Sequence, residues 1–86
     1  MANPHRPTLI ALGQALRVLR KDRGLSQDRL ANLAGIDRAY LGGIERAERH
    51  PTWEAIEKLL DTLETSWTEF GQRIDSCAAA TDDRRK

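Results

Sequence analysis

The segment QDRLANLAGIDRAYLGGIER, residues 27–46, has the pattern of two short helices joined by a tight turn. Ser26 precedes the first helix as an N-cap, and Gly35 follows it, where a left-handed backbone conformation ends a helix. Asp37 is the expected N-cap of the second helix. The apolar positions expected to point inward in the first helix are Leu30, Ala31, Leu33 and Ala34. A short turn of this kind sets two helices at ~90–120°, so the segment predicts a helix-turn-helix.

Two adjacent glycines, Gly42 and Gly43, lie within the second of these helices, where each costs about 1 kcal/mol relative to alanine. On a helical wheel, Tyr40, Leu41 and Ile44 fall on the core face. The outward face carries two long cations and three small residues, namely Arg38, Arg46, Ala39, Gly42 and Gly43. Such a face is expected to let something large come close. The two candidates are the major groove of DNA, which admits one α-helix, and another helix at a tight protein contact.

The rest of the chain predicts three more helices around this unit. One spans about residues 8–24 from an N-cap at Thr8, one begins after Thr52, and one begins after the capping box of Ser66 and Glu69. Without alternating strand patterns, the chain predicts an all-α, compact five-helix domain. The predicted organisation is a flexible N-terminal arm (1–7), a helix-turn-helix domain (8–78, with its last helix at about 67–78) and a polar tail (79–86).

Composition restricts the class of protein. A chain of 86 residues makes one small domain, which buries only about 60 % of its unfolded surface and gains from association. One cysteine and two histidines make neither an internal disulfide nor a metal-ligand set, so no cofactor or metal is expected. No apolar run is long enough for a membrane span, and the first residues lack the layout of a signal peptide. We therefore expect a soluble, cytoplasmic protein.

Charge is divided unequally along the chain. Residues 1–50 carry nine Lys and Arg against five acids, a balance of +4, and residues 51–86 carry five against eight, a balance of −3. This asymmetry favours a basic face that meets a polyanion, and the alternative is charge that is merely solvated. The sequence has no Cys–His or Ser–His–Asp set at useful spacing and no phosphate-binding glycine loop. An enzyme is therefore not expected.

The stretch GLSQDRLANLAGIDRAYLGGIERAERHPT, residues 24–52, resembles the Cro/repressor-type helix-turn-helix family, also called XRE-like. The matching features are G-L-S-Q before the first helix of the motif, L-A-x-x-A-G-I into the turn, and I-E-R followed by R-x-P-T. The resemblance extends over about residues 12–70. Residues 35–52 are especially similar to the small controller regulators of restriction–modification systems. The resemblance implies a lambda-repressor-like fold and a DNA-binding regulator.

The resemblance also implies which residues would contact DNA. The positions that face base edges are occupied by Asp37, Arg38, Ala39 and Gly43. Among them, Arg38 is the main candidate to read guanine, and Ala39 to contact a thymine methyl group. The positions that contact phosphates are occupied by Gln27, Arg46, Arg49, Arg20 and His50. Arg20 also matches an arginine that pairs with the acid at Glu45, so a structural ion pair is the alternative role for both residues.

Three departures from the family pattern change these expectations. Ala47 stands where glycine is usual, which predicts a different or strained helix end. His50 stands where asparagine is usual, and it either replaces the hydrogen bonds of asparagine or makes the DNA contact of this loop sensitive to pH. Gly42 and Gly43 replace residues that often read bases, which moves the expected specificity toward DNA shape.

The expected assembly is a homodimer on a palindromic operator, because one short recognition helix covers only a few base pairs. The dimer-interface candidates are Trp67, Phe70, Ile74 and Trp53. Trp53 and Phe70 could instead complete the core. The leading function is a sequence-specific, double-stranded DNA-binding transcriptional regulator of repressor or controller type. The alternatives are an antitoxin that binds its own promoter and also masks a toxin, and an adaptor that contacts only proteins.

Overall fold

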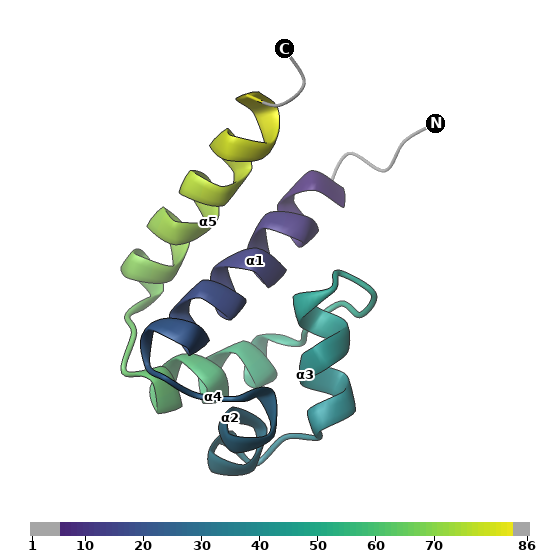
Figure 1. Cartoon of the computed structure of the whole chain (residues 1–86), viewed down its shortest axis with the longest axis vertical. Coiled ribbons are helices and arrows are strands. Elements are labelled where there is room, and N and C mark those ends of the chain that lie inside the picture. The colour runs from purple at the N-terminus through teal and green to yellow at the C-terminus, as the bar shows by residue number, and fades with distance from the viewer. Residues whose placement is uncertain (1–5, 84–86) are drawn as a thin grey trace.

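The computed structural model describes residues 6–83, in which helices are joined by short turns and loops (Figure 1). The five helices are α1 (Arg6–Asp22), α2 (Gln27–Ala34), α3 (Arg38–Glu45), α4 (Trp53–Leu63) and α5 (Trp67–Asp83). The two long helices α1 and α5 run side by side in opposite directions, and the three shorter helices pack together at one end of this pair (Figure 1). The all-α, five-helix prediction is confirmed. Within residues 6–83, no helix is both long and apolar enough to cross a membrane.

The ends of the two long helices differ from the prediction. Helix α1 begins at Arg6 rather than after Thr8, so the predicted arm is shorter by the residues that α1 takes up. Proline is tolerated in the first turn of a helix, where its missing N–H has no intrahelical partner, and Pro7 lies there. Helix α5 continues to Asp83 instead of ending near residue 78, because the alanines that follow Cys77 favour helix. The rest of the predicted arm and tail, residues 1–5 and 84–86, lies outside the described residues.

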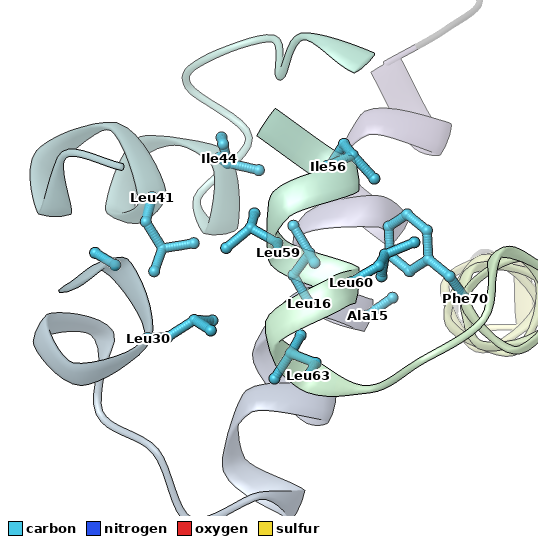
Figure 2. Packing of buried hydrophobic residues seen from close by; sticks show 11 residues of the cluster. Ala15, Leu16, Leu30, Leu41, Ile44, Ile56, Leu59, Leu60, Leu63 and Phe70 are labelled. Carbon is cyan, nitrogen blue, oxygen red and sulfur yellow. The ribbon is translucent and has the colours of Figure 1, made fainter. Parts of the chain in front are cut away.

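The core lies where α4 crosses between the helix-turn-helix and the α1–α5 pair. Figure 2 shows Leu16, Leu59 and Leu63 at its centre, with Leu30 on one side and Phe70 on the other. The fully buried large side chains are Leu16, Leu30, Leu41, Ile44, Leu59 and Leu63. The prediction that Leu33 points inward is wrong, since its side chain is exposed. At 100° per residue, Leu30 and Ala31 bound the buried face of α2, and Leu33 lies about 60° beyond Leu30, outside that face.

Local signals at the helix starts are confirmed by hydrogen bonds. Ser26 Oγ accepts from the Arg29 N–H at 3.0 Å, and Thr52 Oγ1 accepts from the Ala55 N–H at 3.0 Å. At the start of α5, Ser66 Oγ accepts from the Glu69 N–H, and Glu69 Oε1 accepts from the Ser66 N–H. That backbone hydrogen bond from Ser66 is the main reason why the pKa of Glu69 lies below its usual value.

Helices α1 to α4 end in the same way, with a residue in the left-handed conformation. These residues are Gly24 (φ 69°), Gly35 (φ 74°), Ala47 (φ 61°) and Glu64 (φ 54°). After α3, the Ala47 N–H donates to Ile44 O and the Glu48 N–H donates to Gly43 O, which is the double hydrogen bond of a Schellman motif. Ala47 thus has the left-handed backbone that the predicted strain requires, because a Cβ atom crowds the carbonyl oxygen in this conformation.

Replacing Ala47 by glycine is expected to raise the free energy of unfolding by about 1 kcal/mol, because glycine adopts positive φ without strain. Chemical denaturation of both proteins at one concentration measures the change. Ala39→Gly is the control, since Ala39 lies in α3 with an ordinary helical backbone and glycine there lowers stability. A loss of stability from Ala47→Gly would contradict the strain.

Gly13 allows α1 to pack against the end of α3, a contact that periodicity did not reveal. A Cβ added at Gly13 would lie 2.5 Å from Ile44 O and 2.7 Å from Glu45 O. Both are backbone atoms that cannot turn away as a flexible side chain can. Gly13→Ala is therefore expected to lower the free energy of unfolding by about 2–3 kcal/mol.

The measurement is again chemical denaturation, with Gly42→Ala as the matched control. A Cβ at Gly42 meets only side-chain ends, with Arg46 Nη1 at 3.0 Å and Gln27 Oε1 at an ordinary 3.5 Å, so that change is expected to be neutral or stabilising by up to about 1 kcal/mol. Equal effects of the two substitutions would show that the α1–α3 contact does not depend on Gly13.

Candidate nucleic-acid interface

The N-terminal end of α3 presents three of the four predicted base-facing residues. Asp37, Arg38 and Ala39 are all exposed there. The Asp37 carboxylate accepts from the Tyr40 N–H at 3.3 Å and so caps the helix, as predicted. Arg38 forms an ion pair with Asp28 of α2, with 2.7 Å between Nε and Oδ1. The end of α3 is thus held beside the start of α2 and faces solvent.

Gly42 and Gly43 do not form the open face that the helical wheel predicted, since both are buried. The space that a Gly43 Cβ would need is taken by the aliphatic part of Arg49. Gly42 lies beneath the Arg46 guanidinium and the Gln27 side-chain oxygen. Gly43 therefore does not present its backbone to a base in this structure. The glycines make room for side chains of the same chain, because the loop after α3 folds back over the helix.

The loop between α3 and α4 is held in place by Tyr40. The Tyr40 hydroxyl accepts from the Thr52 N–H at 3.0 Å and donates to the His50 carbonyl oxygen at 3.4 Å. The guanidinium of Arg49 lies over the Tyr40 ring, 5.4 Å from its centroid, in cation–π geometry. The wheel placed Tyr40 only on the core face, so its role in ordering the loop was missed.

The predicted phosphate-contacting residues of this loop are all exposed. Arg46 forms an ion pair with Glu48, with 3.1 Å between Nε and Oε1. Arg49 and His50 follow and also face solvent. The loop therefore adds three basic or ionisable side chains on α3's C-terminal side, while Arg38 and Ala39 occupy its N-terminal end.

A buried polar network confirms the predicted ion pair between Arg20 and Glu45. Arg20 Nε and Nη2 donate to the two Glu45 carboxylate oxygens at 2.7 and 3.0 Å, and Arg20 Nη1 donates to Leu25 O at 2.8 Å. Gln27 Nε2 donates to Glu45 Oε1 at 2.9 Å. The network joins α1, α2 and α3.

The burial of this network favours the structural role of Arg20 over the predicted contact with a phosphate. Only 9 % of the Arg20 side chain and 3 % of the Glu45 side chain are exposed, and all three Arg20 nitrogens are engaged inside the protein. Arg20 therefore fixes the helices relative to one another. Gln27 is half-buried at the start of α2, where free backbone N–H groups and the helix dipole favour an anion.

A second exposed surface, made of aromatic side chains, lies at the starts of α4 and α5. Trp53 is 72 % exposed and stacks on Trp67, with 4.3 Å between ring centroids and 11° between planes. The alternative that Trp53 completes the core is therefore wrong. Phe70 does complete the core, with 3 % exposed, and its prediction as an interface residue is corrected. Beside the indoles is a hollow of about 310 Å³, whose apolar lining includes half-buried Ile74.

An exposed N-terminal end of one short helix, braced by a second helix across a tight turn, is the arrangement that DNA-binding helix-turn-helix proteins use. Comparison with known proteins agrees with this class. The chain belongs to the helix-turn-helix domain family, whose model matches residues 11–71.

Among its relatives, the control protein C.SmaI of Serratia marcescens is 38 % identical over 55 residues, which cover 64 % of this chain and 66 % of C.SmaI. The restriction–modification controller protein C.AhdI of Aeromonas hydrophila superposes with a TM-score of 0.70 and 45 % identity, covering 72 % of this chain and 94 % of that one. The C.Esp1396I tetramer in complex with its natural 35 base-pair operator gives a TM-score of 0.77 at 28 % identity, covering 84 % and 95 %. Two longer regulators are matched over only 33 % and 38 % of their length.

Proposed function

We propose that the protein is a sequence-specific regulator of transcription that binds double-stranded DNA as a homodimer on a palindromic operator. The observation that carries this proposal is the exposed end of α3, where Arg38 and Ala39 stand clear of the core. The likeness to C.Esp1396I, which has been crystallised with its operator, supports it. A controller role in a restriction–modification system and a cytoplasmic location belong to the same proposal.

In this proposal, the two ends of α3 have different tasks. Arg38 reads a guanine through O6 and N7, and Ala39 contacts a thymine methyl group in the major groove. Arg46, Arg49 and His50 bind phosphates from the loop that follows α3, which fixes the position of the helix without reading sequence. Gln27 binds a phosphate on the other side, at the start of α2.

Selection from random duplex DNA at about 150 mM salt tests the proposal directly, because nonspecific binding is weak under that condition. The expected result is a two-fold symmetric site with half-sites about ten base pairs apart. If no sequence is enriched and the weak binding disappears with added salt, the result would favour one of the two alternatives. These are an antitoxin that needs its partner to bind DNA and a module that contacts only proteins.

The stacked indoles are the proposed centre of the dimer interface. Two exposed tryptophans beside an apolar hollow form a patch that is unusual on a monomer, and tryptophan is prominent among residues that dominate binding energy at interfaces. A second copy of this chain is the proposed occupant, because the related C.Esp1396I is a tetramer on its operator.

Trp53→Ala is expected to raise the dimer dissociation constant at least about 30-fold, which corresponds to loss of a hot-spot contact of about 2 kcal/mol. Sedimentation velocity over a concentration series measures it. The helical content of the protein is expected to stay unchanged because Trp53 is largely exposed. Leu33→Ala is the control, since Leu33 is an exposed large apolar residue on α2. An unchanged dimer in Trp53→Ala would move the interface elsewhere.

A further inference from the structure

Both arginines at the ends of α3 lie against carboxylates, but the two ion pairs differ in kind. Glu48, the partner of Arg46, lies two residues further along the same loop. Asp28, the partner of Arg38, belongs to the first turn of α2, so this pair bridges the two helices of the helix-turn-helix. A bridge between helices can fix where the arginine points relative to the whole domain.

The geometry of the Asp28–Arg38 pair leaves the end of the guanidinium pointing away from the carboxylate contact. The short distance, 2.7 Å, joins Asp28 Oδ1 to Nε, at the inner side of the group. A guanidinium is a rigid planar fork, and its outer edge carries the N–H groups of Nη1 and Nη2. Those two nitrogens are a suitable pair for the O6 and N7 atoms of guanine. Arg38 can therefore keep Asp28 and bind guanine at the same time.

Holding Arg38 in one orientation has an energetic consequence. A free arginine side chain has about 2 kcal/mol of rotamer entropy, part of which is lost when it binds a base. In this protein, 64 % of the Arg38 side chain is exposed, so packing restricts it little and Asp28 supplies the restraint. The restraint also places a cation at the N-terminal end of α3, which the helix dipole alone disfavours.

The charge of Asp28 also acts on DNA that offers no guanine in the right place. Its side chain is 75 % exposed, so the carboxylate repels phosphates that approach the end of α3. Repulsion of this kind weakens nonspecific binding, which depends on phosphate contacts. At the correct site, the contact of Arg38 Nη1 and Nη2 with guanine compensates for the repulsion between Asp28 and the phosphates. Asp28 thus increases the difference in affinity between the operator and other DNA in two ways. It holds Arg38 in place for guanine, and it repels phosphates where no guanine is present.

We propose that Asp28 is a positioning residue that sets the sequence specificity of Arg38, by holding its Nε while the outer edge reads guanine. This inference rests on the proposed function, in which Arg38 is the base-reading residue. It assigns a role in recognition to α2 in addition to the one that Gln27 has in binding phosphate.

Asp28→Asn and Glu48→Gln form a matched pair that tests the proposal. Each removes one negative charge from a carboxylate that is paired with an exposed arginine. Dissociation constants are measured for the selected operator and for a scrambled duplex of the same length at one salt concentration. Specificity is the dissociation constant for the scrambled duplex divided by that for the operator. Asp28→Asn is expected to reduce this ratio at least about tenfold, with tighter binding to the scrambled duplex. Glu48→Gln is expected to tighten both duplexes alike and leave the ratio unchanged.

Three results would overturn the proposal. If Asp28→Asn changes both dissociation constants by the same factor, Asp28 acts only by repelling DNA of any sequence. If it tightens the operator more than the scrambled duplex, Asp28 competes with DNA for Arg38 instead of positioning it. If it reduces the ratio equally in an Arg38→Ala background, Asp28 acts without Arg38.

The Arg38→Ala background also separates this inference from the proposed function. When Arg38→Ala loses the operator preference but Asp28→Asn keeps it, only the role of Asp28 is wrong. When Arg38→Ala itself keeps the preference, Arg38 is not the reader, and both proposals are overturned. Thermal unfolding of each variant checks the fold, and Asp28→Asn is expected to change stability by less than about 1 kcal/mol because the pair is exposed.

Discussion

Glu45→Ala is expected to lower the free energy of unfolding by about 3–5 kcal/mol, the usual cost of leaving a buried charge without its partner. Arg20 would stay in a site where only 9 % of its side chain is exposed, with two of its three nitrogens no longer donating to a carboxylate. Gln27 would lose its acceptor as well. A domain of this length has a total stability of roughly 4–13 kcal/mol, so the loss is a large part of it.

Urea denaturation at a fixed protein concentration measures this effect, with Glu48→Ala as the control. Glu48 also pairs with an arginine, but both side chains are exposed, so its loss is expected to cost at most about 1 kcal/mol. Should Glu45→Ala not fold, the double variant Arg20→Met with Glu45→Leu keeps the test open. It is expected to recover much of the stability, because apolar residues of similar volume can replace a buried pair. Similar losses from Glu45→Ala and Glu48→Ala would contradict the role of burial.

The same network explains how α3 keeps its orientation. Glu45 lies at the C-terminal end of α3, and it accepts hydrogen bonds from Arg20 of α1 and Gln27 of α2. Gly13 brings the backbone of α1 against that same end of α3. Helices α1 and α2 thus fix one end of α3, which leaves the other end, at Arg38, exposed and in a defined direction. The fold of a small domain is here closely tied to the geometry of its proposed DNA surface.

The helices could be predicted from the sequence because their signals are local. The N-cap at Asp37 and the capping box at Ser66 and Glu69 depend on atoms only three residues apart. The unusual helix end at Ala47 was expected from the resemblance to a family in which glycine is usual there, and the structure shows the left-handed residue that a Schellman motif needs at that position. Signals of this kind depend little on the tertiary fold.

Apart from Leu33, the misplaced residues depend on contacts that reach beyond their own helix. A helical wheel shows that Gly43 lies away from the core, but not that Arg49 of the following loop lies over it. Hydrophobicity alone does not distinguish Trp53, which is exposed, from Phe70, which is buried. The partnership of Asp28 with Arg38 joins two helices across a turn, so no spacing rule within one helix could have revealed it.

Arg38→Ala is expected to abolish the preference for the operator while much of the nonspecific, salt-sensitive binding remains. One bidentate contact to guanine contributes about 1–3 kcal/mol of discrimination, and a symmetric dimer makes that contact once in each half-site. The ratio of dissociation constants for a scrambled duplex and the operator should therefore fall by roughly two to four powers of ten. Stability should change little, since the Arg38 side chain is exposed and its only described ion pair is the one with Asp28.

Arg49→Ala separates reading of the sequence from binding of the backbone. Arg49 lies in the loop after α3, against the Tyr40 ring, where it is proposed to contact a phosphate and no base. Its loss should weaken the operator and the scrambled duplex by the same factor and reduce the slope of log K against log salt by about one for each phosphate contact removed. Binding constants for both duplexes at four salt concentrations distinguish the two variants. Equal losses from Arg38→Ala and Arg49→Ala on both duplexes would mean that Arg38, too, binds only the backbone, and that this surface selects its site by the shape of the DNA.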